Sequence, residues 1–167
     1  GGEASIEHAE QAGRIVGEVQ GKTFVVQSIE RREKKRNPVA PFITSRLQQE
    51  ASRKLHFSPK KTMTLAQQLY EGIEIGAEGA TGLITYMRTD GIDMAPEAVM
   101  AAREVIGKRY GAAYVPGSPR MYKNKAKNAQ EAHECIRPTD MAASPETVRL
   151  EADQAKLYDL IWKRSIA

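Results

Sequence analysis

TSRLQQEASRKLH, residues 44–56, decides the fold class of this 167-residue chain. Leu47, Ala51 and Leu55 recur every four residues, so they fall on one face of a helix. Thr44 or its neighbour can cap the start, because a side-chain oxygen there accepts a hydrogen bond from an early backbone N–H. The stretch therefore predicts an amphipathic helix with one buried face.

The rest of the chain beyond residue 40 is also mainly helical by pattern. Threonines at positions 62 or 64 can open a second helix after the break at 56–59, and a helical pattern returns in APEAVMAAREVIGKRY. The stretch 83–88 is too short and too rich in β-formers for a helix, so we expect it to be extended. Beyond residue 70, helices are predicted at 95–110, at 129–136, ending before Pro138, and at 153–167.

Before residue 40 the pattern predicts a helix followed by a strand. Helix formers fill residues 3–20, and Gly21 is a typical stop. Residues 22–33 are rich in β-branched and aromatic side chains, which favours a strand. Two prolines then interrupt regular structure, so we place a domain boundary near residue 40. The expected fold class is α+β, with residues 1–40 separate from a mainly helical domain at 41–167.

Charge is concentrated in one part of the sequence. The chain carries 25 basic and 21 acidic residues, a net charge of +4. Residues 31–61 hold ten basic and two acidic side chains, a net of +8. Such an excess suits a stripe that faces phosphates, and it suits a solvated basic face beside a linker equally well. With no apolar run of about 18 residues and no secretory leader, a cytoplasmic protein with no membrane partner is expected.

Metal and disulfide chemistry are not expected within this chain. Its three histidines are spread along the sequence, and Asp90 with Asp93 is only an isolated acidic pair. Cys135 is the single cysteine, which excludes an internal disulfide framework and any Cys-rich zinc site.

The nonapeptide GLITYMRTD, residues 82–90, holds the first candidates for chemistry. If it is extended, Tyr86 and Arg88 are two residues apart and point to the same side. A phenol becomes a good nucleophile when its anion is stabilised, and a guanidinium can stabilise that anion and bind phosphate oxygens. The pair suggests attack on a phosphate; the alternative is a packed tyrosine beside a surface arginine.

AHECIRP, residues 132–138, holds the second candidates. On the predicted helix His133 and Arg137 lie at i and i+4 and face together, with Glu134 on another side. This pair follows a basic segment, so it can hold a backbone phosphate. The alternative is a capping histidine and an arginine at a helix end.

Five stretches in this order and spacing resemble the type IA DNA topoisomerases, over residues 38 to 167. The resemblance implies that Tyr86 attacks a DNA phosphodiester and becomes joined to the 5′ phosphate. It also implies that Arg88 contacts that phosphate and that His133 lies beside the bound strand. The stretches are PFITSRLQQEASRKL (41–55), AQQLYEG (66–72), GLITYMRTD (82–90), KNAQEAHECIRPTD (127–140) and LYDLIWKRSIA (157–167).

The same resemblance implies partners and a cofactor. Single-stranded DNA is the expected substrate, and passage of a strand through the break relaxes negative supercoils without ATP. Mg²⁺ is expected in the intact enzyme on a Toprim domain that this chain lacks, so we expect the chain alone to be inactive. Residues 1–40 are expected to end the preceding β-rich gate domain.

Two other classes of protein share some of these features. A tyrosine recombinase also forms a phosphotyrosine, but its nucleophile follows a His-x-x-Arg pair, whereas Tyr86 here precedes His133 and Arg137. A helical DNA-binding module without catalysis fits the basic stripe. An adduct with DNA that depends on Tyr86 separates this module from an enzyme.

Overall fold

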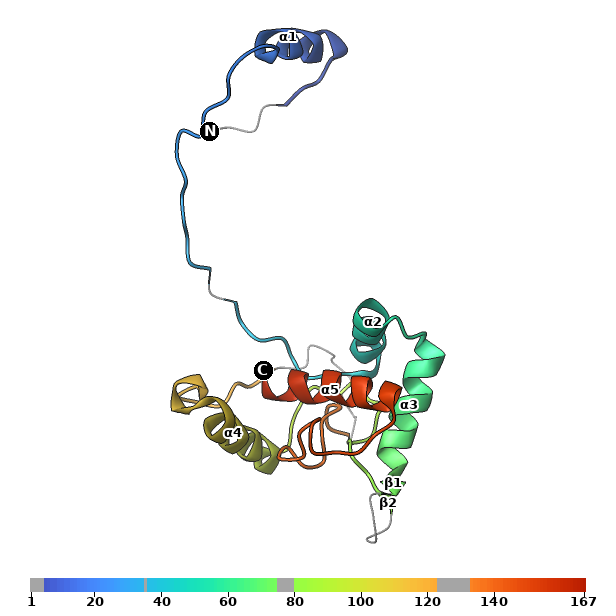
Figure 1. Cartoon of the computed structure of the whole chain (residues 1–167). Helices are drawn as coiled ribbons and strands as arrows, with labels where there is room; N and C mark the ends of the chain where they lie inside the picture. The colour runs from blue at the N-terminus through green and yellow to red at the C-terminus, as the bar shows by residue number, and fades with distance from the viewer. Residues whose placement is uncertain (1–4, 35, 75–79, 123–132) are drawn as a thin grey trace. The chain divides into compact units, whose positions relative to one another are not determined.

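The computed structural model describes residues 5–34, 36–74, 80–122 and 133–167 (Figure 1). The chain divides into two compact units, Gly1–Arg36 and Asn37–Ala167, a few residues before the boundary expected near residue 40. The described elements are α1 (Ala9–Val19), α2 (Thr44–Leu55), α3 (Pro59–Glu71), β1 (Ile73–Glu74), β2 (Ala80–Thr81), α4 (Pro96–Tyr110), the 3₁₀ turn η2 (Ala112–Tyr114) and α5 (Ala152–Ile166).

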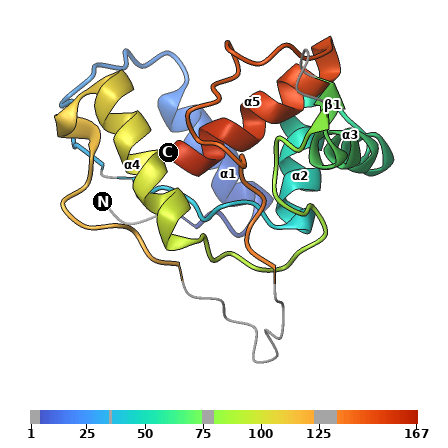
Figure 2. The same cartoon turned by 90° about the horizontal axis from the view of Figure 1, so that it is seen from below.

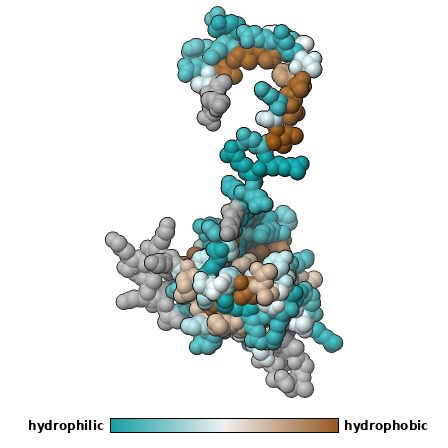
Figure 3. Space-filling view, turned by 90° about the vertical axis from the view of Figure 1, so that its left-hand side faces the viewer, coloured by the Kyte–Doolittle hydropathy of each residue, from teal (hydrophilic) through white to brown (hydrophobic). Residues whose placement is uncertain are grey.

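The first unit contains one helix among its described residues. The helix expected at residues 3–20 is confirmed over α1, and the chain turns at Gly21 with a φ of +79°. The strand expected at residues 22–33 is wrong, because this segment forms no β-ladder. Hydrophobic side chains of this unit lie open at its surface (Figure 3). The exposed fractions are 78% for Phe24, 82% for Val25, 75% for Val26 and 77% for Ile29.

A strand is stable only when its backbone groups pair with a neighbouring strand. Residues 22–33 have β-forming side chains but no such neighbour among the described residues. The described part of the chain is therefore mainly helical, with β1 and β2 as a two-residue antiparallel ladder. The expected α+β description with a β-rich neighbour is not confirmed.

In the second unit, helix α5 is central to the packing. It lies between the α2–α3 pair on one side and α4 on the other (Figures 1 and 2). The indole Nε1 of Trp162 in this helix donates to the Met141 carbonyl at 3.0 Å, and the Tyr158 hydroxyl donates to the Ala143 carbonyl at 2.6 Å. Side chains that are fully buried in this core include Phe42, Leu47, Ala51, Ala66, Leu69, Met87, Ile136, Leu157, Tyr158 and Ile161.

The helix starts differ from the expected ones. Thr44 is the first residue of α2, and its hydroxyl donates to the Met87 carbonyl instead of capping the helix. Ser58 caps α3 by accepting from the backbone of Lys61 at 3.2 Å, and Pro59 occupies the first turn. The start expected at Thr62 or Thr64 is therefore too late by about one turn.

The helix expected at residues 129–136 is wrong for residues 133–136, and residues 129–132 lie outside the described part of the chain. Residues 133–138 are extended, with single β-bridges from Ile136 to Phe42 and from Pro138 to Ile84. The backbone N–H of Ile136 donates to the Phe42 carbonyl at 2.8 Å. These partners are distant in sequence, so local pattern could not reveal them. Within the described ranges, no helix has the length and apolar character needed to cross a membrane.

Candidate active site

Three segments that carry the sequence motifs meet in one place. The segment 82–91 pairs with the segment 133–139 through two backbone hydrogen bonds. The Thr85 N–H donates to the Arg137 carbonyl at 2.9 Å, and the Thr139 N–H donates to the Leu83 carbonyl at 3.0 Å. The start of α2 joins them, since Thr44 N donates to the Thr89 carbonyl at 3.0 Å. The stretch expected to be extended is non-helical, with a bridge at Ile84 followed by bends.

Tyr86 lies half-buried between two other rings. Tyr70, in the last turn of α3, meets it edge-on with ring centroids 5.4 Å apart. The imidazole of His133 lies 4.8 Å from the Tyr86 ring, tilted by 46°. The structure therefore brings Tyr86 and His133 together from positions 47 residues apart in the chain. Tyr70 was not among the residues singled out from sequence, although it belongs to the AQQLYEG motif.

Two threonine hydroxyls hold the backbone on either side of Tyr86. The Thr44 hydroxyl donates to the Met87 carbonyl at 2.8 Å and accepts from the Thr89 N–H at 2.9 Å. The Thr85 hydroxyl donates to the Cys135 carbonyl at 2.7 Å and accepts from the Arg137 N–H. Sequence reasoning missed both roles, because neither partner lies within the threonine's own element.

Two glycines allow the segments to approach closely. A Cβ at Gly91 would lie 2.3 Å from the His133 carbonyl oxygen, and one at Gly82 would lie 2.6 Å from the Tyr70 carbonyl oxygen. Both distances are shorter than any side chain tolerates, so the backbone contact around Tyr86 depends on the absence of a Cβ at these positions.

Arg88 is exposed, whereas its neighbour Met87 is fully buried. Among the described residues, the Arg88 guanidinium makes no hydrogen bond or ion pair. A positive charge in this state can still engage an incoming phosphate. That Arg88 shares a face with Tyr86 stays a prediction.

Arg137 has a different setting from the expected one. Its side chain is 11% exposed and holds Glu134 through two hydrogen bonds, Nε to Oε2 at 2.9 Å and Nη2 to Oε1 at 2.8 Å. Glu134 also accepts from the Ala95 N–H at the start of α4, at 2.9 Å. The arrangement in which His133 and Arg137 share one helix face is wrong, because residues 133–136 are not helical. A DNA contact by Arg137 stays a prediction.

Two titratable groups in the segment 133–139 have shifted pKa values. The Arg137 hydrogen bond lowers the pKa of Glu134, so its carboxylate stays ionised. Burial raises the pKa of the Cys135 thiol to about 12. This thiol is therefore protonated and unreactive at neutral pH. The described residues contain no group of acidic, histidine or cysteine side chains that can hold a metal ion.

The basic stripe expected at residues 31–61 is divided between the two units, because the boundary falls after Arg36. In the second unit several of its members are paired. Arg53 and Lys54 contact Glu50, and Lys61 reaches Asp153 at 2.5 Å. Hence only part of the stripe offers free positive charge.

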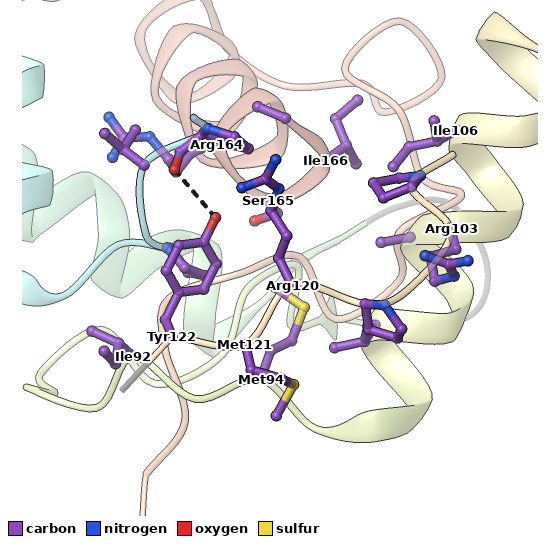
Figure 4. Close-up of a pocket in the computed structure, with 18 of the residues that line it drawn as sticks. Ile92, Met94, Arg103, Ile106, Arg120, Met121, Tyr122, Arg164, Ser165 and Ile166 are labelled. Carbon is purple, nitrogen blue, oxygen red and sulfur yellow. Dashed lines mark hydrogen bonds between the residues drawn. The ribbon is translucent and has the colours of Figure 1, made fainter. Parts of the chain in front are cut away.

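A separate cavity of about 280 Å³ lies elsewhere in the second unit (Figure 4). Its wall is mainly apolar and includes Arg103 and Arg120, and the Tyr122 hydroxyl donates to the Pro38 carbonyl at 3.5 Å. Tyr86, Arg88, His133 and Arg137 do not line it. This apolar cavity and the candidate active site are therefore different places.

Comparison with known proteins identifies the family. A family described as DNA topoisomerase matches residues 2–167. DNA topoisomerase 1 of Rickettsia felis is 53% identical over 98% of this chain, and that of Xylella fastidiosa is 48% identical over 92%. A structure of full-length topoisomerase I from Thermotoga maritima matches 97% of this chain, with 41% identity and a TM-score of 0.69.

This chain therefore belongs to the DNA topoisomerase family, and the resemblance to its type IA members is confirmed. It covers 21% of the Rickettsia felis protein and 25% of the Thermotoga maritima chain. The chain thus spans about a fifth to a quarter of the length of these relatives.

Proposed function

We propose that this chain carries the nucleophile of a type I DNA topoisomerase, an isomerase that needs no ATP. The observation that supports this most strongly is the setting of Tyr86. Its side chain is only half-buried, its ring contacts the ring of His133, and the backbone on either side of it is held by two other segments. A packing tyrosine needs burial alone, whereas a nucleophile needs a fixed position with access to substrate.

In the proposed reaction the Tyr86 phenolic oxygen attacks a phosphorus atom of single-stranded DNA. The oxygen–phosphorus bond to Tyr86 forms while the bond from phosphorus to the 3′ oxygen breaks. The phenol gives up its proton, and the departing 3′ oxygen gains one. Because one phosphodiester replaces another, the reverse attack by the 3′ hydroxyl reseals the strand after passage of another strand, which relaxes negative supercoils.

Arg88 and His133 are proposed to act on the DNA. The exposed Arg88 guanidinium would neutralise charge on the phosphate oxygens as the bond to Tyr86 forms. His133, in ring contact with Tyr86, would lie beside the bound strand. Arg137 is already bound to Glu134, so it would reach DNA only by giving up part of that ion pair.

Mg²⁺ is proposed to bind a Toprim domain in the full-length enzyme rather than this chain. The described residues offer no cluster of metal ligands, so no step here is assigned to the ion. We therefore expect this chain alone, with Mg²⁺, to leave a negatively supercoiled plasmid unchanged. Robust relaxation by the chain alone would contradict this part of the proposal.

Covalent capture on the full-length enzyme tests the nucleophile. A single-stranded oligonucleotide labelled at its 3′ end stays on the protein after denaturation, because the bond forms to the 5′ phosphate of the downstream piece. The same oligonucleotide labelled at its 5′ end releases the label. We expect Tyr86→Phe to abolish the adduct while DNA binding is retained.

Tyr70→Phe is the matched control, since it removes a hydroxyl from the adjoining ring and keeps the edge-on packing. This variant is expected to form the adduct. If the unmodified enzyme binds DNA and forms no adduct, the non-catalytic DNA-binding module is the better assignment. If Tyr86→Phe still forms one, another residue is the nucleophile.

A further inference from the structure

The two threonines beside Tyr86 form a clamp on its backbone. Thr85 precedes the tyrosine and ties it to the segment 133–139. Thr44 ties the residues that follow the tyrosine to the first turn of α2. Each hydroxyl both donates and accepts a hydrogen bond, so each binds two backbone groups that lie at least 43 residues away in the chain.

The clamp is anchored in the core on both sides. Ile84 is 1% exposed and Met87 is fully buried, so the residues around the tyrosine cannot shift without disturbing packing. The tyrosine ring itself faces the half-open side, where Tyr70 and His133 contact it. The backbone is therefore held by the core, while the Tyr86 side chain is only half-buried.

Resting on the proposed function, we infer that Thr44 and Thr85 are positioning residues, whose hydroxyl groups set where the Tyr86 oxygen meets the phosphorus. Each hydroxyl is already engaged by backbone groups, so it acts on the reaction through the position of the Tyr86 backbone. Loss of one hydroxyl keeps Tyr86 among the same neighbours but loosens the backbone on one side of it, so the position of its oxygen is less well fixed. Because a misplacement of about 1 Å can slow a reaction by about 100-fold, a small shift of this backbone has a large effect on rate.

The test compares Thr44→Val with Thr44→Ser in the full-length enzyme. Valine has the shape of threonine but no hydroxyl, and serine has the hydroxyl but not the methyl group. We expect Thr44→Val to slow adduct formation at saturating oligonucleotide by about 10- to 100-fold, with an unchanged concentration for half-saturation. Thr44→Ser is expected to restore most of the rate.

Thr62→Val is the matched control for simple loss of a buried hydrogen bond. Thr62 is fully buried, and its hydroxyl donates to the Ser58 carbonyl at 3.0 Å within α3. Thermal unfolding reports the stability of all variants. If Thr44→Val loses as much stability as Thr62→Val but only Thr44→Val slows the reaction, the positioning role is supported.

Equal rates for Thr44→Val and Thr62→Val would overturn the inference, and so would a serine variant as slow as the valine variant. Should Thr44→Val fail to fold, Thr85→Val replaces it under the same criteria. Tyr86→Phe is measured in parallel: an adduct from this variant rejects the proposed function itself, whereas its absence together with a normal rate for Thr44→Val rejects the clamp alone.

Discussion

The two units of this chain contain similar apolar side chains, but these are exposed in the first unit and buried in the second. In Gly1–Arg36 the helix α1 buries no residue, and the four apolar side chains of the 24–29 stretch are at least three-quarters exposed. In Asn37–Ala167 three helices and two extended segments enclose a core that reaches zero exposure. An apolar pattern thus shows which side chains of a segment can be buried. They become buried only when another segment packs against them.

The difference is clearest in the extended segments. Residues 22–33 and residues 133–138 are both non-helical, but only the second segment makes β-bridges among the described residues. Its partners are Phe42, which lies two residues before α2, and Ile84, which lies two residues before Tyr86. The candidate active site is therefore built where extended backbone found long-range partners.

The largest expected effect comes from truncating a core side chain. Trp162→Ala should lower the free energy of unfolding by about 3–5 kcal/mol, because the indole is 2% exposed and donates to Met141. Phe24→Ala, at a side chain that is 78% exposed, should change it by less than about 0.5 kcal/mol. Urea unfolding of the two variants measures both, and equal losses would contradict the division into a packed and an unpacked unit.

Replacing a glycine by alanine should destabilise the second unit and stabilise the helix of the first. Gly91→Ala forces a Cβ against the His133 carbonyl and should cost about 1–3 kcal/mol. Gly17→Ala lies inside α1 with no atom within 4 Å of the new Cβ, so it should stabilise that helix by about 0.5–1 kcal/mol. Urea unfolding reports the first change and helical circular dichroism the second. A neutral Gly91→Ala would show that the close backbone contact beside Tyr86 is dispensable.

Removing the Glu134 charge should have a smaller effect that depends on pH. The Arg137 hydrogen bond lowers the pKa of Glu134 in the folded protein, so the stabilisation is present above the ordinary carboxyl pKa. It is lost as the pH falls through the lowered value. Glu134→Gln should cost about 1 kcal/mol at pH 7, because a third of the side chain meets solvent, and less in acid.

Thermal unfolding from pH 7 to pH 3 measures this dependence. Glu33→Gln, in the exposed stretch of the first unit, is the control and should change little at any pH. A cost for Glu134→Gln that stays constant down to the lowest pH would contradict the role of its charge.

The smallest expected effect is the absence of a reaction. Cys135 is fully buried and burial raises its pKa to about 12, so iodoacetamide at pH 8 should not modify the native protein. Under the same conditions trypsin should cut first after Arg31 or Arg32, which are exposed and outside regular structure. Mass spectrometry measures both, with urea as the positive control for the thiol. Rapid alkylation before any cut would place the least stable region in the second unit instead.

The long helices could be predicted because their backbone hydrogen bonds are local and their apolar faces recur at a regular spacing. The helix expected at 95–110 is α4, and the one expected at 153–167 is α5, each within a residue of the observed ends. Apolar residues at helical spacing and a proline in the first turn are visible in the sequence itself. The family motifs are visible for the same reason, since they are short runs of letters in a set order.

The sequence by itself therefore determined the helices of the second unit, the family, and the choice of Tyr86, Arg88 and His133 as residues to examine. Only the tertiary structure decided that residues 133–138 are extended, that Arg137 binds Glu134, and that the Thr44 hydroxyl bonds the backbone that follows Tyr86. The physical reason is the range of the interactions. A helix satisfies its backbone within four residues, whereas an extended segment takes its conformation from whatever distant backbone it meets.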